Sequence, residues 1–266
     1  YKMIDFHNHI LPDLDDGSKS LEMSMDMLRT AADQGITDII NTVHFQHPKV
    51  DGIDITLERC SEKRELLYDE MVKEDLSIKI HLGAEVFYLP NLVEVINPLT
   101  TFGHGKYMLI EFLSHQIPDT QQQVLFDLKM QGVTPIIAHP ERYKPVQENL
   151  SLVYKWINAG CLIQLDAGSL TGSLGNIARI SAMEIVKRKL CQFIGSDVHD
   201  NKRRNFCLKE AIELCDNVSD DDIDQWVYQN PSKLMSGEPI EVMIEDEPQP
   251  KVNLFAKLFN KKGKFN

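Results

Sequence analysis

Residues 107–112 read Tyr-Met-Leu-Ile-Glu-Phe, a short run with a continuously apolar centre. Such a run is typical of a strand in a parallel sheet, because helices cover both faces of these sheets. Six similar runs occur along the chain, and a polar turn and a helical pattern follow most of them. The predicted strands are Lys2–Phe6, Asp38–Val43, Ile78–Gly83, Tyr107–Phe112, Thr134–Ala138, Cys161–Leu165 and Gln192–Gly195. The repeated order of strand and helix predicts an α/β fold with a parallel sheet.

The segments between these strands show the spacing of apolar residues that is typical of helices. A glycine just past a helix favours the left-handed C-cap conformation, and Gly35, Gly132 and Gly160 hold such positions. The predicted helices are Ser18–Gln34, Thr56–Glu74, Thr120–Gln131, Leu150–Ala159 and Asn176–Lys189. We expect a single domain built as a distorted (β/α) barrel of seven strands, with an open doubly wound sheet as the second choice.

The C-terminal part of the chain changes character after the seventh strand. Two further helices are expected at Asn205–Cys215 and Asp220–Asn230, the second with Ser219 as its N-cap. We place a single folded domain at residues 1–237 and a tail at residues 238–266. The tail ends in a segment with five lysines and several apolar side chains. A frayed terminus is favoured over an amphipathic helix that docks on a partner or a membrane surface.

Composition and charge exclude several classes of protein. The 266 residues are 42% hydrophobic and carry a net charge of −12, which disfavours nucleic-acid binding. There is no apolar run of the ~20 residues that a membrane span needs and no visible signal peptide. The five cysteines form no Cys-x-x-Cys pair, which predicts reduced thiols in the cytoplasm. No cysteine has an arginine six positions later, so the loop of cysteine-based tyrosine phosphatases is absent.

Histidines and carboxylates gather at the ends of the predicted strands. His7 and His9 follow the first strand, and their spacing on an extended segment directs both imidazoles to the same side. Because the carboxyl ends of parallel strands meet at one edge, side chains there converge on a shared site. Five of the seven predicted strand ends carry such residues. The candidate metal ligands are His7, His9, Asp16, His44, Glu85, His139, Asp197 and His199.

This set of ligands indicates which metals bind and how many. Imidazole and carboxylate without thiolate suit Mn, Fe or Zn. One ion takes about four to six ligands, so eight candidates predict two or three ions, with a carboxylate such as Glu85 shared between them. Bound cations would also reverse the negative potential that an anionic substrate would otherwise meet.

These motifs resemble those of the polymerase and histidinol phosphatase (PHP) superfamily over roughly residues 3–237. Within it, the chain is similar to the bacterial PHP-type tyrosine phosphatases associated with capsule and exopolysaccharide synthesis. Residues 45–47, Phe-Gln-His, stand where some relatives have an arginine, so the contacts of that loop stay open. The stretches that carry the similarity are His7-Asn8-His9 with Asp13-x-Asp15-Asp16-Gly17, Ala138-His139-Pro140-Glu141-Arg142-Tyr143, and Ser196-Asp197-x-His199 with Arg204.

The resemblance implies a distorted barrel of PHP type, a multinuclear centre that is often manganese, and phosphotyrosine as substrate. It places His7, His9, Glu85 and Asp197 on one metal, Glu85 and His139 on a second, and Asp16, His44 and His199 on a third. The remaining ligand of the second metal stays unassigned. Water activated by these metals would be the nucleophile, because coordination lowers its pKa from ~15.7 towards ~7.

Two arginines are candidates for binding the phosphoryl oxygens, since guanidinium binds phosphate in a bidentate way. They are Arg142, which could instead pair with Glu141 or another carboxylate, and Arg204, which Arg203 could replace. His199 is a further candidate for the catalytic set. His47, His81, His104 and His115 are expected to be ordinary loop or strand histidines outside the site.

The expected function is metal-dependent hydrolysis of phosphotyrosine on a protein, such as a bacterial tyrosine kinase of polysaccharide synthesis. The alternative is a small-molecule phosphomonoesterase of the histidinol phosphatase type. A nuclease and a non-enzymatic module that docks a kinase are less favoured, the first because of the acidic charge and the second because the ligand set is full.

Overall fold

The computed structural model of this chain describes residues 2–215, 218 and 220–242. Seven strands form one parallel sheet in which each strand pairs with the next along the chain. All seven predicted strands are confirmed. Their bounds are β1 Met3–Asn8, β2 Ile36–Phe45, β3 Lys79–Phe87, β4 Tyr107–Glu111, β5 Thr134–Ala138, β6 Leu162–Asp166 and β7 Phe193–Gly195.

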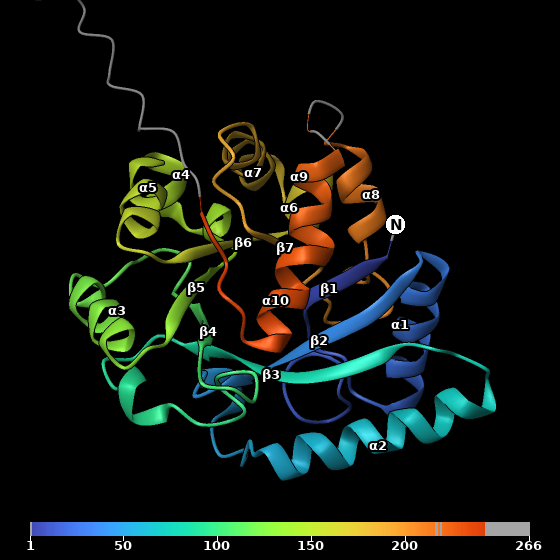
Figure 1. Cartoon of the computed structure of the whole chain (residues 1–266). Coiled ribbons are helices and arrows are strands. Elements are labelled where there is room, and N and C mark those ends of the chain that lie inside the picture. Colours follow the sequence, from blue (N-terminus) through green and yellow to red (C-terminus); the bar gives the residue numbers. More distant parts are fainter. Residues whose placement is uncertain (1, 216–217, 219, 243–266) are drawn as a thin grey trace, which may run out of the picture.

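The two edges of the sheet approach one another and nearly close a barrel. The backbone N–H of Asp197, just past β7, donates to the carbonyl of His7 at 2.7 Å, and that of His9 donates to Val198 at 2.9 Å. In Figure 1, β1 lies between β7 and β2. The expected distorted (β/α) barrel is therefore confirmed, and the open sheet is excluded.

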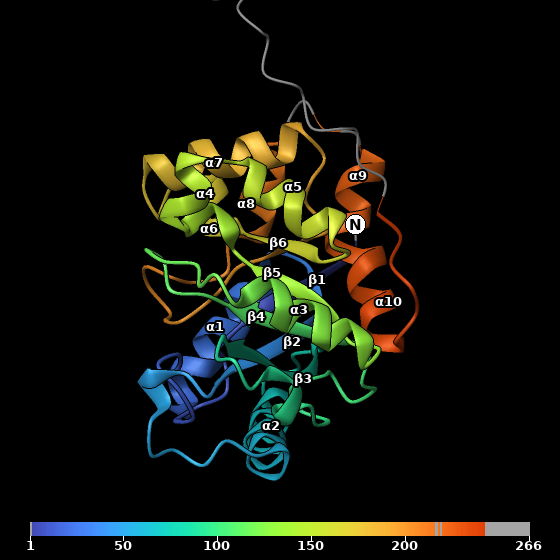
Figure 2. The same ribbon diagram turned by 90° about the vertical axis from the view of Figure 1, so that its left-hand side faces the viewer.

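Helices surround the strands on the outside of the barrel (Figures 1 and 2). All five helices predicted between the strands are present. Helices α4 and α6 were not predicted, because each is a single short turn without a periodic apolar pattern. The helices up to the last strand are α1 Leu21–Asp33, α2 Leu57–Lys73, α3 Gln121–Met130, α4 Lys144–Glu148, α5 Ser151–Asn158, α6 Ala167–Thr171 and α7 Asn176–Lys187, with short 3-10 turns at Pro48–Val50, Leu92–Val95 and Pro140–Arg142.

Helical segments follow β7; the last of those described covers the amino ends of the strands, and the first packs against α6. These segments are α8 Leu208–Glu213, α9 Asp220–Asp224, a π-helical turn at Gln225–Gln229, and α10 Asn230–Ser236. The sequence predicts that the last helix ends at Asn230, before Pro231. That boundary is wrong, because Pro231 lies in the first turn of α10, where its missing N–H costs no hydrogen bond. The Ser219 cap and residues 243–266 of the tail lie outside the described residues.

The side chains form one apolar core around the barrel and a second inside it. Inside, the rings of Phe6 and Phe193 stack with centroids 4.4 Å apart, and Leu234 of α10 belongs to the same cluster. Along β4, Tyr107 and Leu109 point into the barrel, whereas Met108 packs against the outer helices. This apolar filling leaves the carboxyl ends of the strands as the place for polar chemistry. Among the described residues, none of the helices combines the length and the apolar character that a membrane crossing requires.

Gly195 sets how closely β7 can approach β1. A Cβ atom at this position would lie 2.6 Å from both the backbone nitrogen and the Cβ of His7. We expect Gly195→Ala to lower the free energy of unfolding by about 1–3 kcal/mol, the usual cost of overpacking a core. Urea unfolding of the metal-free protein measures this effect without a contribution from ligand binding. Unchanged stability would contradict the close approach of the two strands.

Candidate metal centre

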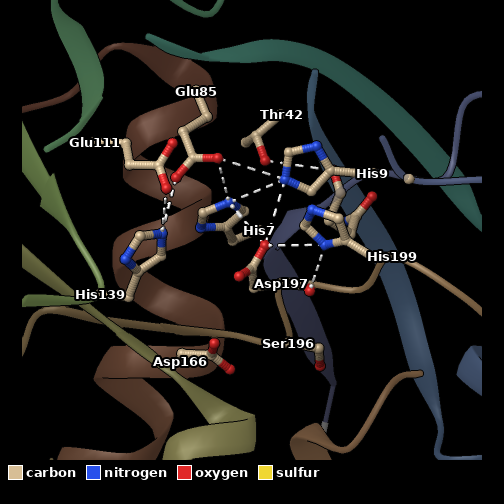
Figure 3. A network of polar contacts seen from close by, with 12 residues as sticks. His7, His9, Thr42, Glu85, Glu111, His139, Asp166, Ser196, Asp197 and His199 are labelled. Atoms are coloured by element: carbon tan, nitrogen blue, oxygen red, sulfur yellow. Dashed lines mark hydrogen bonds and ion pairs between the residues drawn. The ribbon is translucent and has the colours of Figure 1, made fainter. Parts of the chain in front are cut away.

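The eight predicted ligands converge on one site at the carboxyl ends of the strands. His7, His44 and Glu85 lie on β1, β2 and β3. His139 directly follows β5, and Asp197 is the second residue after β7. Seven of the eight are buried, and Asp16 is partly exposed, with 28% of its side chain accessible. Figure 3 shows the imidazoles and carboxylates turned toward one another.

One group of ligand atoms belongs to His7, His9, Glu85 and Asp197, which can together hold a metal ion. The Nε2 atom of His7 lies 3.3 Å from Glu85 and 3.4 Å from Asp197. The Nε2 atom of His9 lies 3.5 Å and 3.3 Å from the same two carboxylates. Two nitrogens and two oxygens therefore surround one point.

Hydrogen bonds behind His7 and His9 fix which ring nitrogen faces this point. The Nδ1 atom of His7 lies 3.1 Å from the side-chain oxygen of Gln164, and that of His9 lies 2.7 Å from Asp15. Both partners accept hydrogen bonds, so each Nδ1 carries the proton and each Nε2 presents a lone pair. The two Nε2 atoms are only 3.3 Å apart. A cation between them would satisfy both lone pairs at once.

A second group joins His9 and His44 to residues from two loops. The Oδ1 atom of Asp16 lies 3.1 Å from His44 and 3.2 Å from His199. The Nδ1 atom of His199 donates to the carbonyl of Asp197 at 3.0 Å, which leaves its Nε2 lone pair facing Asp16. These four residues can also hold a metal ion.

A third group contains Glu111, which the sequence analysis missed. Its carboxylate forms a group with His44 and Glu85 that can hold a metal ion. His139 approaches the same place, with Nε2 2.9 Å from Glu85 and 3.8 Å from Glu111. Glu85 is thus close to every part of the cluster.

Unpartnered polar atoms support a fit to metal ions. Buried polar side-chain atoms in folded proteins almost always have a hydrogen-bond partner. Here many of the atoms without one belong to the candidate ligands, and their concentration in one small volume matches the donor set of a multinuclear centre. They are Asp16 Oδ1, both ring nitrogens of His44, Glu85 Oε2, Glu111 Oε2, His139 Nδ1, Asp197 Oδ1 and His199 Nε2.

The carboxylates also repel one another in the absence of cations. Burial alone would raise the pKa of Glu85, but the surrounding imidazoles, His7 foremost, hold it well below the ordinary value. Burial and the charge of Glu85 raise the pKa of Glu111 to about 7. Burial and the charge of Asp197 likewise raise the pKa of Asp166 to about 7. Bound divalent cations would offset this crowding of negative charge.

Both predicted arginines lie at the edge of the cluster. Arg142 pairs with Asp197 and, at 3.3 Å, with Asp166, while Arg204 pairs with the same oxygen of Asp197 as Arg142 does. The alternative expectation that Arg142 pairs with a carboxylate is therefore met by Asp197 and Asp166, and not by Glu141, which is buried. The side chains of Arg142 and Arg204 are 27% and 29% exposed, so both reach from the cluster to solvent. The structure places Arg204, and not Arg203, against Asp197.

Backbone strain occurs at two of the candidate ligands. His139 has φ 31° and Asp197 has φ 45°, values that residues other than glycine rarely adopt. Both lie just past a strand, β5 or β7, and both side chains face the cluster. Such outliers concentrate at functional sites, where the surrounding structure holds them in place.

His47 lies closer to the cluster than the sequence analysis predicted. Its ring stacks on that of His44 with centroids 4.5 Å apart, and its Nε2 atom is 3.5 Å from Glu111. His81 and His104 lie elsewhere, paired with Asp38 and with the carbonyl of Leu234. The orienting residues Asp15 and Gln164 were also missed as members of the site.

Comparison with known proteins gives a consistent result. The model of the family described as "Capsular polysaccharide synthesis, CpsB/CapC" matches residues 3–236. CapC of Staphylococcus aureus is 35% identical over 212 residues, which make up 79% of this chain and 82% of that protein. Tyrosine-protein phosphatase YwqE of Bacillus subtilis is 31% identical over 250 residues, 93% of this chain and 96% of YwqE.

Solved structures agree with these relatives. A chain from the crystal structures of YwqE of Bacillus subtilis and CpsB of Streptococcus pneumoniae, described as metal-dependent tyrosine phosphatases, superposes with a TM-score of 0.83. It is 31% identical, and the match covers 90% of this chain and 96% of that chain. The histidinol phosphate phosphatase of Lactococcus lactis matches with a TM-score of 0.52 at 17% identity, over 81% of this chain and 93% of its own. That likeness concerns the fold alone.

Proposed function

Because the chain belongs to the capsular polysaccharide synthesis CpsB/CapC family, we propose that it is a metal-dependent tyrosine-protein phosphatase. The observation that carries this proposal is the cluster of inward-facing lone pairs and carboxylates at the open end of the barrel. The named relatives and the solved structure of metal-dependent tyrosine phosphatases support it.

We propose that the cluster holds two or three ions, with manganese as the first choice and iron or zinc as alternatives. His7, His9, Glu85 and Asp197 would hold one ion, and Asp16, His44 and His199 another, with His9 close to both. A third set contains Glu111, which we propose as the ligand that the sequence left unassigned. That set would consist of Glu85, Glu111 and His139, with His44 nearby.

When bound, the ions would supply an activated water as nucleophile and positive charge for the phosphoryl oxygens. The chain itself would supply position and further charge. Arg142 and Arg204 flank Asp197 from the solvent side, where their guanidinium groups can bind the non-bridging oxygens of the phosphate. Phosphoryl transfer depends mainly on such positioning and charge neutralisation, so no protein nucleophile is required.

The proposed substrate is phosphotyrosine on a protein, such as a tyrosine kinase of polysaccharide synthesis. Arg142, Arg204 and Asp16 all reach solvent, so the site opens at the surface where a protein segment can enter. Cys60, Cys161, Cys191 and Cys207 are free thiols, which fits the reducing cytoplasm where we place the protein.

Turnover of a phosphotyrosine peptide and of histidinol phosphate, each with added manganese, tests the proposal. We expect the larger kcat/KM with the peptide. A far larger kcat/KM with histidinol phosphate would assign the enzyme to small-molecule phosphatases instead.

Replacing Arg142 by alanine should lower kcat/KM for phosphotyrosine by about 10- to 100-fold, because a hydrogen bond to a charged group contributes about 1.5–3 kcal/mol. Arg142→Lys should recover only part of the rate, since an ammonium group lacks the planar fork of guanidinium. Arg188→Ala, at an exposed arginine just past α7, is the matched control. A full rate in Arg142→Ala with intact metal content would remove this arginine from phosphate binding.

A further inference from the structure

A cavity of about 460 Å³ lies beside the metal-binding cluster, on the side of Asp197 that is remote from Glu85. Figure 3 shows Asp166 and Ser196, two residues of its wall, on that side. Arg204 belongs both to the cavity wall and to the ion pair with Asp197. A phosphotyrosine bound at Arg204 would therefore have its neighbouring residues close to the cavity.

The cavity carries basic side chains in a strongly acidic protein. Lys202, Arg203 and Arg204 are consecutive and all line it, although the whole chain has a net charge of −12. Lys202 and Arg203 are exposed, and within the described part of the chain no carboxylate forms an ion pair with either. Two carboxylates share the wall. Asp166 is buried and already paired with Arg142. Together with Glu210 it does not balance the three basic residues, so the net charge of the cavity lining is positive.

Hydrogen bonds hold the loop that carries these basic side chains in place. The carboxylate of Asp200 accepts the backbone N–H groups of Lys202 and Arg203, both at 2.7 Å. The side chain of Asn201 donates to Asp26 of α1 at 2.7 Å. Asp200 binds backbone groups here and, within the described residues, forms no ion pair with Lys202 or Arg203, so the two basic side chains stay available for a ligand.

We propose that this cavity binds the carboxylate side chain of an aspartate or glutamate that flanks the target phosphotyrosine. This inference rests on the proposed function and deepens it by naming a sequence preference. An extended chain spans about 3.3 Å per residue, so residues within about three positions of the phosphotyrosine can reach a cavity that adjoins Arg204. The bound segment would complement the positive charge that Lys202 and Arg203 present.

The test compares two phosphotyrosine peptides that differ only in glutamate or glutamine at the three positions on each side. At low ionic strength we expect kcat/KM to be about fivefold higher for the glutamate peptide, mainly through KM, as exposed ion pairs contribute up to about 1 kcal/mol. High salt should reduce this ratio because it screens exposed charges. In Lys202→Glu/Arg203→Glu the ratio should fall to one or below.

Lys79→Glu, an exposed charge reversal at the opposite end of the barrel, is the matched control and should keep the ratio. A ratio of one in the unaltered protein, or a ratio that survives the double charge reversal, would overturn the inference. If the double variant does not fold, Lys202→Gln/Arg203→Gln gives the same comparison. Free phosphotyrosine distinguishes a failure of this inference from a failure of the proposed function. Failure to hydrolyse it would contradict the proposed function itself.

Discussion

Asp197→Ala is expected to lower kcat/KM for phosphotyrosine by at least about 1,000-fold and to reduce the bound metal. Residues that only orient metal ligands already cost about 10- to 100-fold when they are lost. One oxygen of Asp197 faces the imidazoles of His7 and His9, and the other accepts Arg142 and Arg204. The substitution therefore removes a proposed ligand and the anchor of both proposed phosphate-binding groups.

Elemental analysis and turnover on the same sample measure this effect. Asp33→Ala, at an exposed aspartate near the end of α1, controls for the loss of one negative charge. Circular dichroism separates a site defect from unfolding. An Asp197→Ala protein with the parent's turnover would contradict the role of this carboxylate.

Glu111→Gln is expected to lower kcat/KM by about 100-fold and to weaken one class of bound metal, with partial recovery at high manganese concentration. Glutamine has nearly the same shape, so the change tests the charge and not the packing. Glu111 lies close to His44, Glu85 and His139 but does not belong to the His7–His9 group. The ion held by that group should remain, which explains why the expected loss is smaller than for Asp197.

Metal titration of Glu111→Gln, followed by activity and by elemental analysis, measures this loss. Glu94→Gln, at an exposed glutamate, is the matched control. Equal metal content and equal activity in Glu111→Gln and in the parent would remove Glu111 from the centre.

The fold was predictable because the apolar runs and the turns between them agree along the chain. Each predicted strand is present, since a strand covered by helices needs apolar residues in both side-chain rows. The short helices α4 and α6 were not predicted, because a single helical turn is too short to show a repeating pattern of apolar residues. The expected end of the last helix at Asn230 is wrong, because α10 continues to Ser236 and the first turn of a helix accepts Pro231.

The candidate site was predictable from one rule, and its omissions came from applying that rule incompletely. Histidines and carboxylates at strand ends were collected for five strands, but the ends of β4 and β6 carry Glu111 and Asp166. Glu111 was overlooked because the run around it was interpreted as buried and apolar. In the alternation of β4, however, Glu111 shares the inward side of Leu109 and Tyr107.

The choice between Arg203 and Arg204 could not be made from the sequence. The two residues are adjacent, and both follow a loop without regular structure. The turn around Asp200 decides it, because the backbone N–H groups of His199 and Asp200 bind the carbonyl of Arg204. This closure brings the guanidinium of Arg204, and not that of its neighbour, to Asp197.

The central claim is that residues from His7 to His199 share several bound cations that the reaction requires. Elemental analysis of the purified protein, paired with phosphotyrosine turnover before chelation, after chelation and after manganese is restored, tests it most directly. We predict two or three ions per chain, loss of turnover with the metal, and its return with manganese. Undiminished turnover in a sample shown to contain no metal would contradict the account.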